Sequence, residues 1–93
     1  MFVDSFIGFL RVERNYSQHT LRAYAGDVRA FKDFITGVDE SLSFYAVDHD
    51  LVRQWAASLI DSGASAATVC RRLSSLRTFY DYLCREGHLE GHP

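Results

Sequence analysis

Apolar residues recur along the chain at spacings of three and four positions, and no stretch alternates between apolar and polar residues with a period of two. This spacing places the apolar side chains on one face of an α-helix, whereas a half-buried strand requires alternation. The sequence therefore predicts an all-α fold, a compact four-helix bundle with helices near residues 3–14, 18–36, 49–61 and 66–86.

Polar residues and glycines mark the ends of these helices. Ser17, Asp48 and Ser65 stand just before the second, third and fourth helices, where a side-chain oxygen can accept a hydrogen bond from a free backbone N–H group. Gly37 and Gly87 are predicted to end the second and fourth helices, because glycine suits the left-handed conformation found after a helix C-terminus.

Each predicted helix carries an apolar stripe that we expect to face the core. The stripe of the second helix consists of Leu21, Tyr24, Val28, Phe31 and Ile35. The stripe of the fourth helix is the most regular and consists of Val69, Leu73, Leu76, Tyr80 and Leu83. A chain of 93 residues is enough for one such core, so a single domain is predicted.

The chemistry of an enzyme or a metal site is not indicated. The sequence has no Gly-rich phosphate loop, no His-Glu-x-x-His, no Cys-x-x-Cys pair and no Gly-x-Ser-x-Gly. His19, His49, His88 and His92 are scattered, whereas zinc needs three or four convergent ligands. We predict no catalytic residue, no metal, no cofactor and no small-molecule substrate.

The sequence also predicts a cytoplasmic protein. No apolar run approaches the roughly 20 residues that cross a bilayer, so no membrane association is expected. The first residues, MFVDSFIGFL, lack the basic region and the small-residue cleavage site of a signal peptide.

The net charge of −2 argues against nucleic acid binding, because neutralisation of phosphates by Lys and Arg supplies most of the non-specific affinity. However, residues 37–62 hold five acidic side chains against Arg53 alone. The rest of the chain therefore carries a net charge of +2, with Arg71, Arg72 and Arg77 clustered. This distribution leaves nucleic acid binding open.

The fourth helix has a polar face opposite its apolar stripe, which we expect to point outward. It consists of Thr68, Arg71, Ser75 and Thr78, with Tyr82 further along. In a major groove, Arg can reach guanine acceptors, and Ser or Thr can meet bases or phosphates. Arg72 lies nearer the core boundary, from which its side chain could reach a phosphate. An ordinary solvated face is the alternative interpretation.

The second helix has a strip of small residues roughly opposite its apolar stripe. The strip consists of His19, Ala23, Gly26 and Ala30, flanked by Arg22 and Arg29. Small side chains allow a partner to come close, and the first-turn N–H groups beside Ser17 and Thr20 suit a phosphate. Close packing between helices of the bundle is the alternative.

Two segments resemble parts of one protein family. Residues 15–35, NYSQHTLRAYAGDVRAFKDFI, resemble the opening segment of tyrosine recombinases of the Xer and phage integrase types. Residues 64–93, with the pattern Arg-x-Leu-Ser-x-Leu-Arg-x-Phe-Tyr from Arg71 to Tyr80, are similar to the fourth helix and exit segment of the same domain. The order and spacing of the two matches are those of the family.

The resemblance implies a SAM-like core-binding domain that forms half of a clamp around double-stranded DNA. Its second and fourth helices would lie in or beside the major groove. The DNA-facing positions of the family match His19, Thr20, Arg22 and Ala23 in the second helix and Thr68, Arg71, Arg72 and Ser75 in the fourth. Residues 1–87 would form this domain, and residues 88–93 would begin a linker to a catalytic domain.

In the family, that catalytic domain carries Arg, Lys, His and Arg residues around a tyrosine nucleophile that bonds covalently to DNA. We expect no nucleophile in this chain, because Tyr24 and Tyr80 belong to apolar stripes and no arginines and histidine cluster around the other tyrosines. The expected partners are DNA and other recombinase protomers in a synaptic complex.

Two other functions stay open. The acidic residues 37–62 favour a helical protein-interaction domain with no role in DNA. A complete small protein, such as a regulator or directionality factor, is also conceivable, although the open-ended tail HLEGHP speaks against it. The leading prediction is DNA binding in site-specific recombination, and the sequence does not choose between chromosome-dimer resolution and integration of mobile DNA.

Overall fold

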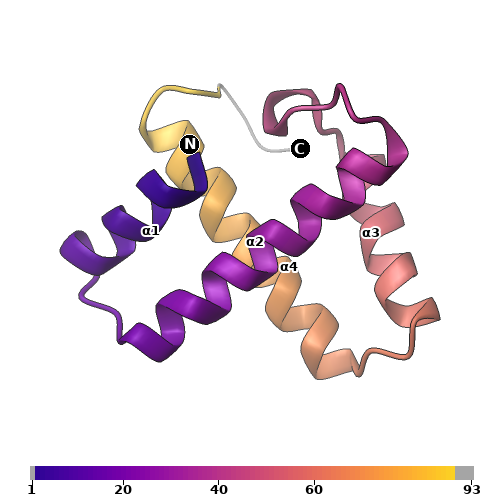
Figure 1. Cartoon of the computed structure of the whole chain (residues 1–93), viewed down its shortest axis with the longest axis horizontal. Coiled ribbons are helices and arrows are strands. Elements are labelled where there is room, and N and C mark those ends of the chain that lie inside the picture. The colour runs from indigo at the N-terminus through magenta and orange to yellow at the C-terminus, as the bar shows by residue number, and fades with distance from the viewer. Residues whose placement is uncertain (1, 90–93) are drawn as a thin grey trace.

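The computed structural model describes residues 2–89 and confirms the all-α four-helix architecture. The elements are α1 (Phe2–Glu13), α2 (Gln18–Val38), the short 3-10 helix η1 (Phe44–Ala46), α3 (His49–Asp61) and α4 (Ala66–Arg85). Figure 1 shows that the two long helices, α2 and α4, cross near their middles. The helix α1 packs against α2, and α3 packs mainly against α4, so α2 and α4 form the centre of the bundle.

The predicted helix starts are confirmed. Ser17, Asp48 and Ser65 each accept a hydrogen bond from the backbone N–H three residues later, at 3.2, 2.9 and 3.1 Å. At the other end of the chain, Gly87 has a φ of +79°, which favours glycine and ends the fourth helix as predicted. These boundaries depend on residues within one turn of the chain.

The predicted end of the second helix was wrong. Gly37 lies inside the last turn of α2, which continues to Val38. The chain leaves the helix at Asp39, whose carboxylate accepts hydrogen bonds from the Ser41 backbone N–H at 2.9 Å and from the Ser41 hydroxyl at 2.7 Å. These bonds lower the pKa of Asp39. They offer the backbone a local alternative to the helix, so the glycine is not needed as the stop.

Aromatic rings dominate the core around α4. Phe79 packs edge-to-face against Phe6 of α1 and Phe44 of η1, with ring centroids 5.2 and 4.7 Å apart. Both Phe79 and Phe6 are fully buried, and Phe79 lies outside the single apolar stripe predicted for this helix. The helix buries a wider arc than one stripe because α1, α2 and α3 surround it.

Tyr80 ties α4 to η1 through a buried hydrogen bond. Its hydroxyl donates to the Phe44 carbonyl oxygen at 2.8 Å. The variant Tyr80→Phe removes the donor and leaves that carbonyl unpaired, so we expect the free energy of unfolding to fall by about 1–2 kcal/mol. Urea denaturation of the two proteins at pH 7 measures the difference.

The same contact predicts a loss of stability in alkali. Burial raises the pKa of Tyr80, so the folded state favours the neutral phenol. The corresponding stability is fully present below the unfolded pKa of about 10 and is lost as the pH rises further. Thermal melts between pH 8 and pH 11 should therefore show a steeper loss for the wild type than for Tyr80→Phe. Parallel curves would show that Tyr80 does not control alkaline unfolding.

Candidate nucleic-acid interface

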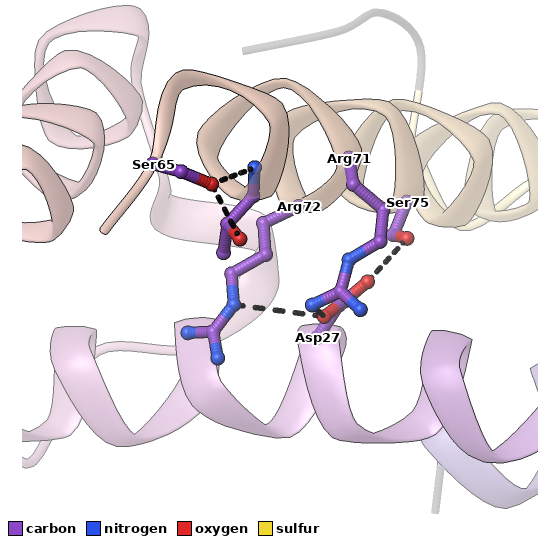
Figure 2. Close-up of polar contacts among 6 residues, drawn as sticks. Asp27, Ser65, Arg71, Arg72 and Ser75 are labelled. Atoms are coloured by element: carbon purple, nitrogen blue, oxygen red, sulfur yellow. Dashed lines mark hydrogen bonds and ion pairs between the residues drawn. The ribbon is translucent and has the colours of Figure 1, made fainter.

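A charged cluster occupies the crossing of α2 and α4. Figure 2 shows the side chains of Arg71, Arg72 and Ser75, all from α4, converging on Asp27 of α2. The Ser75 hydroxyl donates to Asp27 Oδ2 at 2.7 Å, and Arg71 Nη2 donates to Asp27 Oδ1 at 2.9 Å. Arg72 Nε lies 3.7 Å from the same Oδ1, is buried and has no hydrogen-bond partner.

Asp27 is only 3% exposed, which makes its charge costly unless it is paired. The two short hydrogen bonds and the two guanidinium groups supply that pairing. They join residues 44 and 48 positions apart in the sequence. The cluster therefore ties the middle of α2 to one face of α4.

The outward face predicted for the fourth helix is only partly correct. Ser75 and Tyr82 are buried, with 5% and 7% of their surface exposed. The helix α2 crosses over Ser75, while the rings of Phe6 and Phe9 lie 5.5 and 5.2 Å from the ring of Tyr82. The side chain of Arg71 is 53% exposed, as expected, although its tip reaches back to the buried carboxylate.

The other predicted residues of α4 are only partly exposed. Thr68 and Thr78 are half-buried. Arg72 is also half-buried, with 30% of its side chain exposed, in agreement with the predicted position at the core boundary. The N-terminal half of α4 thus offers Arg71, part of Arg72 and the Thr68 hydroxyl to a partner.

The predicted strip on α2 is accessible over its first turns. His19 and Arg22 are exposed, and Thr20 and Ala23 are half-buried. Gly26 is exposed, and a Cβ atom added there would meet nothing within 4 Å. Close packing within the bundle therefore does not explain this glycine.

The small-residue strip meets the core at its far end. Ala30 is half-buried and packs against the core, so the packing alternative accounts for this residue. The positions that match the family's DNA-facing segment, from His19 to Ala23, lie nearer the start of the helix and are not covered in this way.

The fold brings the two predicted segments to the same side of the crossing. The segment from His19 to Ala23 lies in the N-terminal half of α2, and the segment from Thr68 to Ser75 lies in the N-terminal half of α4. Figure 1 shows both halves below the crossing, diverging from it toward the capped helix N-termini. The two segments thus lie on the same side of the crossing, and the buried Asp27 carboxylate lies between α2 and α4.

Asp27 was missed in the sequence. A detectable signal exists, because Asp27 stands three positions after Tyr24 and four before Phe31, the spacing of the apolar stripe. An acidic residue at a stripe position requires a buried partner. The sequence does not show that the partners are Arg71 and Ser75, because they lie on another helix.

Three tyrosines of the chain are poor nucleophiles. Burial raises the pKa of Tyr24, Tyr80 and Tyr82, and the carboxylate of Glu86 adds to the effect at Tyr82. A nucleophilic tyrosine needs an activated hydroxyl with a lowered pKa or a nearby base. Tyr80 and Tyr82 lie in the core and Tyr24 packs against it, and this burial favours the neutral phenol.

Histidines and acidic residues do not converge on a metal site in the part of the chain that the structure describes. Among residues 2–89 there is no group of three or more His, Cys, Asp or Glu side chains placed to hold a metal ion. His19, His49 and His88 are exposed on separate segments, and His92 lies outside the described residues. The helices within 2–89 are also too short or too polar to span a bilayer.

Comparison with known proteins identifies the family of this domain. Residues 3–87 match the family described as phage integrase, N-terminal SAM-like domain. The chain is 38% identical over 94 residues to tyrosine recombinase XerC of Oceanobacillus iheyensis, covering 100% of this chain and 30% of that protein. It is 38% identical over 92 residues to tyrosine recombinase XerC of Halalkalibacterium halodurans, covering 98% of this chain and 30% of that protein.

A third relative, tyrosine recombinase XerC of Pelotomaculum thermopropionicum, is 34% identical over 98% of this chain and 31% of its own length. The chain therefore spans about a third of the length of these relatives. No solved structure matches it significantly. The four-helix fold and the match over residues 3–87 show that the chain belongs to the SAM-like N-terminal domain family of the phage integrases, the tyrosine recombinases.

Proposed function

We propose that this domain binds double-stranded DNA as the N-terminal half of the clamp of a site-specific tyrosine recombinase. The observation that carries the proposal is that the N-terminal halves of α2 and α4 lie on the same side of their crossing. These halves carry the exposed cations Arg22 and Arg71 and the half-buried residues Thr20 and Thr68, and Arg22 lies on the side of α2 that faces α1. The name of the XerC relatives supports a role in recombination.

The chemistry of these two helix halves suits a duplex. A guanidinium has five N–H donors, and only one nitrogen of Arg71 is bonded to Asp27. Its other donors are available to a guanine edge or a phosphate. Arg22 is exposed one turn from the N-terminus of α2, where a phosphate also benefits from the positive end of the helix dipole.

The remaining assignments follow from the family. Residues 1–87 form the DNA-binding domain, and residues 88–93 begin the linker to the catalytic domain, which performs strand cleavage in the whole protein. From residue 90 onward this linker lies outside the described residues. The partners are DNA and other protomers of the recombinase, and the protein acts in the cytoplasm.

A titration of duplex DNA at two salt concentrations tests the proposal. We expect a Kd of about 10⁻⁴ to 10⁻⁶ M near physiological salt, with weaker binding as salt rises. The variant Arg22→Ala should weaken binding similarly on all sequences. It should also lower the slope of log affinity against log salt concentration by about one unit. The control is Arg53→Ala on α3, because Arg53 is exposed in the acidic segment beside Asp50. Salt-independent binding, or none at low salt, would contradict the proposal.

A protein-interaction domain is the second candidate. Val38 and Ile60 are 53% and 62% exposed, and both lie within the acidic residues 37–62. A contiguous apolar patch marks a protein-binding surface, and these two side chains are candidates for part of one. This function is favoured if the titration detects no DNA binding at low salt.

A further inference from the structure

We infer that Asp27 is a positioning residue for DNA recognition, which holds Arg71 in one arrangement before DNA binds and leaves Arg72 available to a phosphate. The inference rests on the proposed function. Asp27 does not itself reach the partner, because its carboxylate is buried at the crossing. It acts through the two adjacent arginines, which it holds differently.

Arg71 is held by a short bond. Its Nη2 donates to Asp27 Oδ1 at 2.9 Å, while 53% of the side chain is exposed. An exposed arginine without such a bond would populate many rotamers and would lose this freedom on binding. Ordering the guanidinium in advance lowers that cost and favours the geometry needed at a base edge.

Arg72 is held only by charge. Its Nε lies 3.7 Å from Asp27 Oδ1, which is too far for a hydrogen bond, and the nitrogen has no other partner. A buried N–H group without an acceptor is costly, so a reorientation that brings it to a phosphate oxygen would be favourable. The carboxylate thus separates the roles of two neighbouring arginines.

The identity of residue 27 supports this role over simple packing. The position falls on the apolar stripe of α2, where a hydrophobic residue between two crossing helices would avoid the cost of burying a charge. A carboxylate there also reduces the attraction of the domain for DNA. Both costs are explained if the carboxylate is kept for the arrangement of the arginines.

The first test measures the Arg71 side chain in the free domain. Nitrogen-15 relaxation of the arginine Nε–H groups should show Arg71 as rigid in the wild type and as mobile as exposed Arg77 in Asp27→Ala. If Asp27→Ala does not fold, Asp27→Asn keeps the shape of the residue, removes the charge and should give a smaller increase in mobility. An Arg71 side chain that is mobile in the wild type, or rigid in the variants, overturns the inference.

The second test measures sequence preference in DNA binding. The probes are a duplex enriched by the wild-type domain from a random pool and a scrambled duplex of equal composition. We expect Asp27→Ala to weaken binding to the enriched duplex by about tenfold and to leave the scrambled duplex bound at least as tightly. The matched control is Asp33→Ala, which removes the same charge from an exposed position of α2.

The control separates positioning from charge. If both variants change binding to the two duplexes equally, Asp27 acts only through its charge and the inference is overturned. A wild type that binds no DNA would overturn the proposed function, and the inference with it. A wild type that binds and discriminates DNA with a mobile Arg71 side chain would overturn the inference alone.

Discussion

Phe79→Ala is expected to lower the free energy of unfolding by about 3–5 kcal/mol, the largest effect of any substitution considered for this domain. Phe79 is fully buried and packs against Phe6 and Phe44. Its truncation opens a cavity between three segments, which the surrounding side chains fill only in part. Because a domain of this size has a total stability of only about 5–10 kcal/mol, the variant should lose about a third or more of that stability and unfold at a clearly lower urea concentration.

Urea denaturation followed by the fluorescence of Trp55, the only tryptophan in the sequence, measures the change. The control is Phe9→Ala in α1, because Phe9 is only partly buried and its loss leaves a site open to water. We expect the control to cost less than Phe79→Ala. Equal losses of unfolding free energy in the two variants would show that full burial does not make Phe79 more important for stability than Phe9.

Arg71→Ala is expected to weaken both the fold and DNA binding. Interpreted from the sequence as an exposed residue, Arg71 should contribute about 0.5 kcal/mol or less to stability. The structure predicts a larger loss, about 1–3 kcal/mol, because the buried Asp27 carboxylate keeps only the hydrogen bond from Ser75 and the longer ion pair with Arg72. The half-exposed position of Arg71 favours the lower end of this range, since water can reach the vacated site.

DNA binding of the folded Arg71→Ala variant should weaken by a further 1–3 kcal/mol, about 5- to 150-fold. A loss that depends on sequence indicates contact with a base edge, and a uniform loss with a lower salt slope indicates contact with phosphate. The control is Arg77→Ala, an exposed arginine two turns along the same helix, which should change neither stability nor binding strongly. Thermal melts and DNA titrations measure the two effects separately. Unchanged DNA affinity of the folded variant would show that Arg71 has only a structural role.

The sequence by itself determined the helices and the family. Ser17, Asp48 and Ser65 cap the helices as predicted, because an N-cap depends on atoms three residues away on the same chain segment. The wrongly predicted end at Gly37 has an equally local cause, since the Asp39 carboxylate accepts a hydrogen bond from the Ser41 backbone N–H just after the helix. The family was recognisable because its two motifs are continuous segments, and the match over residues 3–87 confirms it.

The tertiary structure decided which faces of α4 are buried. A helical wheel assumes one buried face, and this assumption placed Ser75 and Tyr82 outside. Their burial depends on where α2 and the rings of α1 cross the helix, which no local pattern specifies. The role of Asp27 has the same origin. Its carboxylate is stable in the core only because Arg71, Arg72 and Ser75, from a segment 44 to 48 positions away, reach it. The packing of the whole bundle brings that segment close.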